Sequence, residues 1–304
     1  MRGDRHTLLA GITGAALLSS GVLLWLARDL LAPTSSASGR PSLLEILEEV
    51  RQGPGTRTGP RRPAPPPPAQ AAWISPLASA CAVGGDASLR LRLEAVRPEL
   101  ARRRARVEIH PTNYGKRHRR DAFGNPVDPT PRVVVLHETV YGIGSAINTF
   151  RTPHPRDEDQ VSYHALIGED GTVVDLLDPS LRAFGAGFSA FKGQWVVTNA
   201  EVKGSINNFA LHVSLETPLD GEDAEPSHSG YSEAQYDALA LLLQEWMERY
   251  PIGTDDITTH RHIDLGLARA DPRSFRWDLL GRRLAALGSC RDQIRGAAGI
   301  SRAP

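Results

Sequence analysis

The pattern of hydrophobic and polar positions predicts strands in the second half of the chain. Residues 133–136 form a short, continuous apolar run, which is typical of a central strand. Residues 209–216 alternate, with apolar side chains at the odd positions and polar ones between them, which predicts a strand with two different faces. Residues 161–167 and 172–177 flank the turn sequence Gly-Glu-Asp-Gly, so they predict two strands joined by a turn.

Apolar residues at helical spacing predict helices between these strands. The clearest helix begins with a capping box at residues 232–235 and ends at Pro251. Residues 143–150 suit a second helix, and residues 89–107 predict a third. Together these elements predict an α/β domain over residues 105–290, built on a mixed β-sheet flanked by helices and preceded by a helical lead-in over residues 71–104.

The start of the chain is apolar. Residues 7–27 contain no charged side chain, and as a helix these 21 residues are long enough to cross the roughly 30 Å core of a bilayer. The run is longer than the apolar core of about 7 to 15 residues in a cleaved signal, which favours a transmembrane anchor, although small residues at 35–37 leave cleavage open. Arginines within residues 1–6 predict that this end is cytosolic and that the rest of the chain lies outside.

A proline-rich linker is predicted over residues 28–70. Residues 53–70 hold seven prolines and three glycines in 18 positions, a composition typical of an extended, semi-rigid spacer. After a membrane segment, such a spacer would hold a folded domain away from the bilayer. Residues 291–304 form a C-terminal tail.

Composition narrows the function. Lys and Arg total 35, as do Asp and Glu, and this balance argues against a nucleic-acid binder. We expect a monomer. Cys81 and Cys290 are too few for a disulfide scaffold or a four-thiolate metal site, so any metal would be held by histidine and carboxylate. These cysteines flank the domain and either pair after export or remain free thiols.

Candidate metal ligands occur at the ends of predicted elements. His137 ends the apolar run at the edge of the sheet, where active sites of α/β domains commonly lie. Two neutral imidazoles and one carboxylate can bind zinc and leave a fourth position for water, and His137, His260 and Asp271 supply that set. Spacing alone does not single them out, since a histidine after a buried strand also serves as a structural residue.

Five motifs in a fixed order strengthen this interpretation. They are the strand ending in His137, Ser162-Tyr163-His164-Ala165-Leu166-Ile167 before Asp170-Gly171, Arg182-Ala183-Phe184-Gly185-Ala186-Gly187, Asn207-Asn208-Phe209, and His260 before Arg269-Ala270-Asp271-Pro272. Over residues 132–280 this order resembles the type 2 N-acetylmuramoyl-L-alanine amidases, which are zinc-dependent. The resemblance implies a mixed sheet with helices, a Zn2+ ion in a groove, and cleavage of the amide between N-acetylmuramic acid and L-alanine in peptidoglycan.

The resemblance also assigns roles. It makes His137, His260 and Asp271 the zinc ligands and Tyr163 the active-site tyrosine. Arg269 falls where many members have a lysine that polarises the scissile carbonyl; its permanent charge can stabilise an oxyanion, but it cannot donate a proton.

This chain departs from the family at the general base and beside the groove. Ser214 stands where some members have a catalytic glutamate, and Gly185 stands where several have a histidine. The candidates for the base are therefore Glu138, Glu216 and the phenolate of Tyr163.

Three further histidines need assignment. His262 lies two residues beyond His260, and in a strand the two would share a face, so His262 is an alternative second ligand. We favour His260 because it directly follows the predicted strand 257–259. His164 alternates away from Tyr163 and is predicted to be structural, while His212 either faces the pocket or pairs within the sheet.

These observations predict a membrane-tethered zinc amidase that acts on peptidoglycan in the cell envelope, outside the cytoplasm, or is secreted if the N-terminus is cleaved. The alternative is a non-catalytic peptidoglycan-binding module on the same tether.

Overall fold

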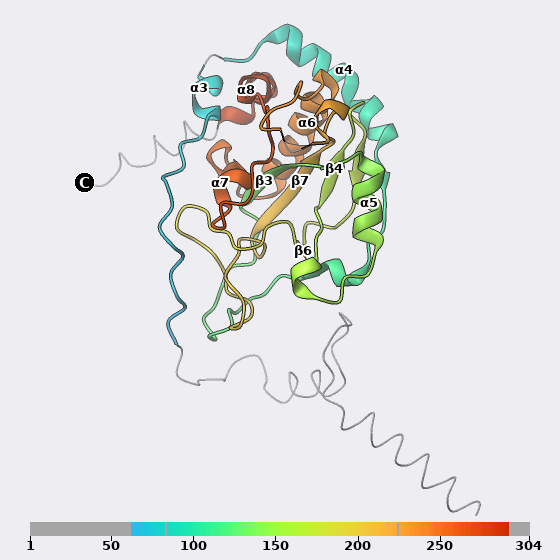
Figure 1. Cartoon of the computed structure of the whole chain (residues 1–304). Coiled ribbons are helices and arrows are strands. Elements are labelled where there is room, and N and C mark those ends of the chain that lie inside the picture. Colours follow the sequence, from blue (N-terminus) through green and yellow to red (C-terminus); the bar gives the residue numbers. More distant parts are fainter. Residues whose placement is uncertain (1–61, 83, 224, 292–304) are drawn as a thin grey trace, which may run out of the picture. The chain divides into compact units, whose positions relative to one another are not determined.

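The computed structural model describes residues 62–82, 84–223 and 225–291, and its centre is a six-stranded sheet (Figure 1). In spatial order the strands are β1 (Ala105–Arg106), β5 (Val173–Asp175), β4 (Ala165–Ile167), β7 (Ala210–Leu215), β3 (Val133–Glu138) and β8 (Ile257–Thr259). Only β4 and β5 pair antiparallel; the other neighbours in this sheet run parallel. The predicted mixed sheet is confirmed, and the antiparallel pair is the predicted hairpin.

The two longest strands of the sheet, β3 and β7, pair from Val133 opposite Ala210 to Glu138 opposite Leu215. Because successive side chains in a strand point to opposite faces, Leu211, Val213 and Leu215 all face the main core. His212 and Ser214 therefore lie on the other face, as the alternation predicts.

Helices cover both faces of the sheet. They are α3 (Leu77–Cys81), α4 (Ala87–Arg103), α5 (Ile143–Arg151), α6 (Glu233–Arg249), α7 (His260–Ile263) and α8 (Trp277–Ala286). The predicted capping box starts α6: the Ser232 hydroxyl accepts from the Gln235 N–H, and the Gln235 side chain accepts from the Ser232 N–H. Figure 1 shows α3, α4, α6 and α8 grouped together, while α5 packs Phe150 against Leu166 on the opposite face of the sheet.

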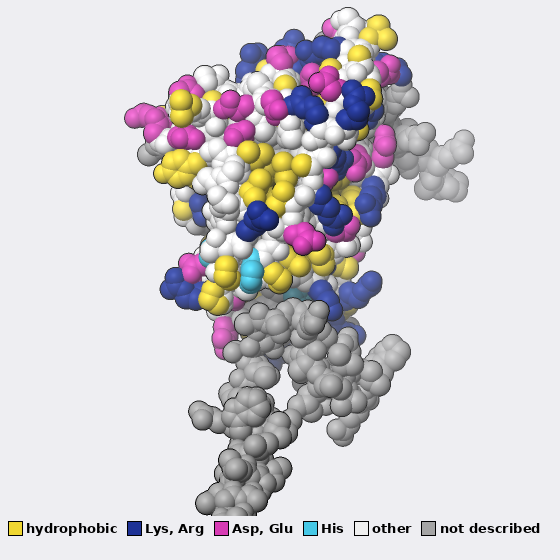
Figure 2. Space-filling model, turned by 90° about the vertical axis from the view of Figure 1, so that its right-hand side faces the viewer, with side chains coloured by type: hydrophobic (Ala, Val, Ile, Leu, Met, Phe, Trp, Pro, Cys, Tyr) yellow, Lys and Arg dark blue, Asp and Glu magenta, His cyan; other side chains and the backbone are white. Residues whose placement is uncertain are grey.

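Helix α4 differs from its prediction at both ends. Asp86 caps it by accepting from the N–H groups of Ser88 and Leu89, so it begins earlier than residue 89. It ends at Arg103 rather than at 107, because residues 105–106 pair with β5. Arg104, the residue after the helix, pairs with Asp175 and Glu245. Figure 2 shows charges of both signs interspersed over the face it displays.

Shorter elements complete the domain. Strands β2 (Tyr114–Lys116) and β6 (Leu181–Ala183) form a separate antiparallel pair. The single-turn helices are η1 (Pro111–Asn113), η2 (Asp157–Asp159), η3 (Leu219–Gly221), η4 (Thr254–Asp256) and η5 (Ser289–Arg291).

Residues 62–76, which we call the strap, run along one side of the domain without helix or strand (Figure 1). The Gln70 amide donates to the carbonyl oxygens of Ala190 and His262, at 2.9 and 3.0 Å. The indole of Trp73 donates to the Asp255 carbonyl and lies 4.5 Å from the His262 ring. This end of the predicted linker is therefore extended, and it is bound to the domain.

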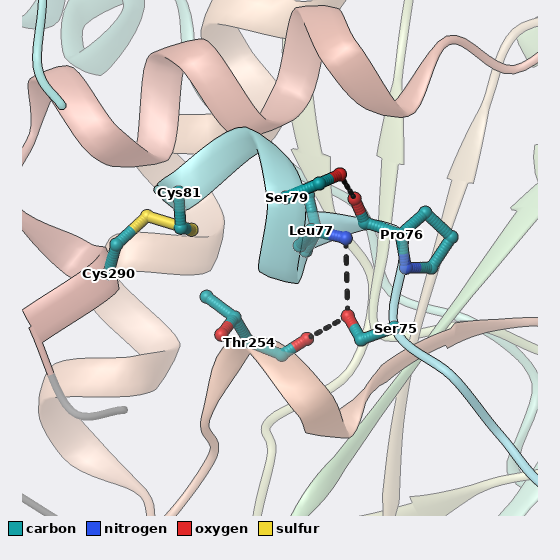
Figure 3. Close-up of a disulfide and its surroundings, with 7 residues drawn as sticks. All are labelled: Ser75, Pro76, Leu77, Ser79, Cys81, Thr254 and Cys290. Carbon is teal, nitrogen blue, oxygen red and sulfur yellow. Dashed lines mark hydrogen bonds between the residues drawn. A yellow bond between two sulfur atoms is a disulfide. The ribbon is translucent and has the colours of Figure 1, made fainter. Parts of the chain in front are cut away.

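A disulfide joins Cys81 in α3 to Cys290 in η5 (Figure 3). Their Cα atoms lie 5.6 Å apart, across 209 residues of sequence. Helix α3 can approach α8 because residue 281 is glycine: a Cβ there would lie 2.1 Å from the Cβ of Ala80. Of the two states left open by the sequence, the structure shows the paired one.

No helix within the part of the chain that the structure describes is long and apolar enough to cross a membrane. The anchor predicted at residues 7–27 lies outside the described residues, as do residues 1–6, 28–61 and nearly all of the C-terminal tail.

Candidate metal centre

Three side chains from distant parts of the sequence meet at one edge of the sheet. His137 lies near the end of β3, His260 begins α7 directly after β8, and Asp271 lies in the loop before α8. The Nδ1 atoms of the two histidines are 3.2 Å apart, and the Asp271 Oδ2 atom lies 3.3 Å from one and 3.1 Å from the other.

These separations fit a zinc ion. Two ligand atoms bound at about 2.0–2.1 Å in tetrahedral geometry lie about 3.3–3.4 Å from each other. Two imidazole nitrogens and a carboxylate oxygen are also the donor types of catalytic zinc sites. Within the described ranges no other histidine, cysteine or carboxylate joins the group, which leaves a fourth position for water or substrate.

The electrostatics of the group also suit a cation. Burial lowers the pKa of His137 to about 4, so its ring is neutral at pH 7 and can offer a lone pair. Burial alone would raise the pKa of Asp271, but hydrogen bonds from His137 and His260 outweigh it and hold that pKa well below its usual range. The centre therefore presents the negative charge of Asp271 and, at His137, a neutral ring.

The second nitrogen of His137 faces another histidine. Its Nε2 atom lies 3.0 Å from the Nδ1 atom of His212, and both side chains are fully buried. The sequence left His212 unassigned; the available signal was the alternation of β7, which places this residue on the same face as Ser214.

Tyr163 lies against the first candidate ligand. Its ring stacks on that of His137 with centroids 4.4 Å apart, and Phe150 supports it edge-on at 5.3 Å. Burial, with the nearby Asp271 carboxylate, raises the pKa of the phenol. The residue is thus a neutral O–H donor at pH 7, which does not favour the phenolate as a base.

Arg269 lines the groove from an exposed loop. Asp264 shapes this loop, since its carboxylate accepts from the backbone N–H groups of Gly266, Ala268 and Arg269 itself. The guanidinium is therefore carried on an ordered backbone beside Asp271.

Glu138 is enclosed by structural partners. Its carboxylate accepts from the Nε and backbone N–H of Arg273, from the Tyr231 hydroxyl at 2.5 Å, and contacts the His228 Nε2 atom at 3.2 Å. Arg273 also donates to carbonyl oxygens in the loop after η3. Glu138 thus joins that loop to the segment after Asp271, and it also lines the groove.

Glu216 is likewise engaged. One oxygen accepts from the Ile143 N–H at the start of α5, at 2.7 Å, and the other accepts from the Glu169 N–H, at 2.9 Å. A carboxylate at a helix N-terminus is stabilised by the helix dipole. Glu216 therefore caps α5, and it is not among the residues that line the groove.

His262 does not join the metal centre, and the physical reason is local. The alternation between residues 260 and 262 assumed a continuing strand, but the Thr259 hydroxyl accepts from the His262 N–H and starts α7. In a helix, residues two apart face different directions. His262 packs on Trp73 instead, while His164 is buried and its Nδ1 atom accepts from the His212 N–H.

A groove of about 1440 Å3 opens over the centre. Its lining includes Tyr163, His260, Asp271 and the half-buried Arg182. Burial lowers the pKa of Arg182 to about 10, so it stays charged at pH 7, and its Nη1 atom donates to Thr198. Pockets for drug-sized ligands hold about 300–1,000 Å3, so this groove suits a longer ligand.

Comparison with known proteins decides the family. Residues 124–274, which contain all three candidate ligands, match the sequence model of the N-acetylmuramoyl-L-alanine amidase family. Residues 124–274 belong to this amidase family. Within the amidase domain, the motifs lie on strands and loops around the groove, in the order predicted from the sequence.

Several curated relatives are similar to this chain. The 1,6-anhydro-N-acetylmuramyl-L-alanine amidase AmpD of Enterobacter cloacae is 33% identical over 103 residues, which cover 34% of this chain and 46% of the relative. AmpD of Salmonella typhimurium LT2 is 30% identical over 130 residues, covering 43% and 60%. The chain therefore spans about half the length of the curated relatives it matches.

Solved structures include similar proteins. A selenomethionine AmpD derivative is 24% identical with a TM-score of 0.43, covering 59% of this chain and 92% of that one. E. coli AmiD, solved with the substrate anhydro-N-acetylmuramic acid-L-Ala-D-γ-Glu-L-Lys, is 21% identical with a TM-score of 0.42, covering 57% and 65%.

Proposed function

We propose that this chain is a zinc-dependent amidase that hydrolyses the bond between N-acetylmuramic acid and L-alanine in peptidoglycan. The observation that carries the proposal is the approach of three donor atoms, from His137, His260 and Asp271, to within 3.1–3.3 Å of one another beside a large groove. A bound zinc ion would supply a Lewis acid and lower the pKa of a coordinated water to about 7.

The residues of the chain would do the rest. Tyr163, as a neutral phenol beside His137, would donate its O–H to the oxygen that gains charge when the amide is attacked. Arg269 would add a fixed positive charge on the groove side of the same oxygen. Glu138 and Glu216 are held by structural hydrogen bonds, so neither is proposed as the general base.

The groove supports a substrate with a peptide attached to a sugar. Its volume exceeds that of a small-ligand pocket, and the charged Arg182 within it suits the carboxylates of a stem peptide. The relatives named as 1,6-anhydro-N-acetylmuramyl-L-alanine amidases support a muramyl peptide rather than a plain peptide as substrate.

We also propose that the domain works outside the cytoplasm, tethered by residues 7–27 or secreted if they are cleaved. The Cys81–Cys290 disulfide supports this location, since such bonds persist in oxidising compartments. The composition of residues 53–70 suits a spacer between membrane and wall.

The test uses the full chain in detergent, with its zinc content measured and peptidoglycan digested with and without a chelator. We expect about one zinc per chain and newly freed L-alanine amino groups, both lost in His137→Ala. Wall binding by a zinc-loaded chain without any freed amino groups would instead establish the alternative, a non-catalytic recognition module.

A further inference from the structure

His212 lies beside the first candidate ligand on the neighbouring strand. It is opposite Val135 in the register of β3 and β7, two positions before Ser214, the partner of His137. Side chains two apart on a strand share a face, so the His212 ring reaches His137 diagonally. The resulting contact joins His137 Nε2 to His212 Nδ1 at 3.0 Å.

The two nitrogens of His137 therefore have different partners. Among the described residues, Nδ1 faces His260 and Asp271, and Nε2 faces His212. A neutral imidazole carries one N–H. When Nδ1 gives its lone pair to a metal, the proton must lie on Nε2, and that N–H needs an acceptor because the ring is fully buried. The Nδ1 atom of His212 is that acceptor.

The surroundings of His212 fix it in this position. Its backbone N–H donates to His164 Nδ1 at 3.0 Å, and the two rings stack at an interplanar angle of 9°. The ring also requires glycine at position 185, because a Cβ atom there would lie 2.4 Å from the Cγ atom of His212. When its Nδ1 atom accepts, the proton of the His212 ring lies on Nε2, which is buried and has no hydrogen-bond partner among the described residues, so His137 is the one partner of this ring there.

We propose that His212 is a positioning residue for the metal centre: by accepting the Nε2–H of His137, it holds the Nδ1 lone pair toward the metal. Gly185 contributes to this positioning because it has no side chain, which leaves room for the His212 ring. The inference rests on the metal site of the proposed function, and it concerns metal binding rather than contact with the substrate.

The test measures the zinc affinity of the full chain by competition with a coloured chelator. Loss of such an outer partner typically weakens metal binding about 10–100-fold, and we expect that loss in His212→Ala. His212→Asn keeps an acceptor oxygen near the place of Nδ1, so it should recover most of the affinity. The matched control is Thr258→Val: Thr258 is opposite Val135 on the other side of β3, is buried, and makes no hydrogen bond to His137 through its side chain.

A second variant covers the case in which His212→Ala does not fold. Gly185→Ala leaves both histidines in the sequence but drives a methyl group into the His212 ring, so zinc affinity should fall. In a His212→Asn background, whose side chain is smaller, the same change should cost less. Circular dichroism of each metal-free variant verifies that it is folded.

The outcomes separate the two proposals. If the unmodified chain binds no zinc, the metal site itself fails. If it binds zinc and folded His212→Ala and Gly185→Ala bind equally tightly, the positioning role of His212 fails while the metal site stands. Equal loss in His212→Ala and folded His212→Asn would also overturn the role, because an acceptor would then make no difference.

Discussion

The Nδ1 atoms of His137 and His260 lie 3.2 Å apart although 123 residues separate them. β3 and β8 pair in parallel, with Leu136 opposite Thr259, and the residue that follows each of these is a histidine. Strand order and register thus bring the two imidazoles together at one edge. Asp271 completes the group from a loop whose neighbour, Arg273, is held by Glu138.

The buried histidines predict a loss of stability in acid. Burial lowers the pKa of His137 to about 4 and that of His164 to about 3, from an ordinary value of 6.5. Below pH 6.5 the unfolded chain binds protons that the folded chain does not, so stability falls as the pH drops toward these lowered values. We expect the melting temperature of the metal-free chain to decrease steadily from pH 7 to about pH 4. A flat profile over that range would contradict the burial of these rings.

Tyr163→Phe removes the proposed oxyanion donor and keeps the ring that stacks on His137. Loss of one such donor typically lowers turnover about 100–1,000-fold. We expect that decrease with zinc content unchanged, as measured by freed amino groups and metal analysis on the same sample. Unchanged turnover would remove the tyrosine hydroxyl from the mechanism.

Arg273→Met leaves the buried carboxylate of Glu138 without its cation. Removing one partner of a buried ion pair typically costs about 3–5 kcal/mol, and we expect a loss of that order in urea unfolding. Arg276→Met is the matched control, because its pair with Asp278 is exposed and such pairs contribute about 0–1 kcal/mol. Similar losses of unfolding free energy in both variants would show that the pair of Glu138 with Arg273 contributes no more stability than an exposed pair.

Trp73→Ala tests the strap. The indole packs on Phe191, His262 and Trp277, so its removal should destabilise the domain by about 2 kcal/mol, less than for a fully buried tryptophan. The neighbouring Ile74→Ala should have almost no effect, because Ile74 is 83% exposed. Equal melting temperatures for both variants would mean that the strap contributes no stability.

Much of the sheet follows from local pattern. The apolar run at 133–136 and the alternation at 209–216 depend on side-chain period alone, and both strands are present. The position of His137 follows from the same pattern. A strand that is buried along its length can present a functional side chain to a groove only at its end. The ends of elements were less predictable: α4 stops at Arg103 because β5 offers residues 105–106 a strand partner.

The hydrogen-bond partners of Glu138 and Glu216 could not be predicted from the sequence. Glu138 meets Arg273 across 135 residues and Glu216 meets Ile143 across 73, so no local spacing marks either contact. Likewise, a single side-chain hydrogen bond at Thr259 turns the backbone into α7 and separates His262 from His260.

Gly185 shows how a departure from a family pattern gains a physical reason only in three dimensions. In sequence it is a missing side chain. In the folded structure, the ring of His212 occupies the space that a side chain at position 185 would need. His212 lies 27 positions later in the sequence, in β7.

The Cys81–Cys290 bond also determines what a protease can do to this chain. A single cut between residues 81 and 290 leaves two pieces that stay covalently joined, and they separate only after reduction. A cut before residue 62 instead frees strap and groove together as one piece. For the proposed tethered form, cleavage within residues 53–61 would therefore release a diffusible piece that holds all three candidate ligands.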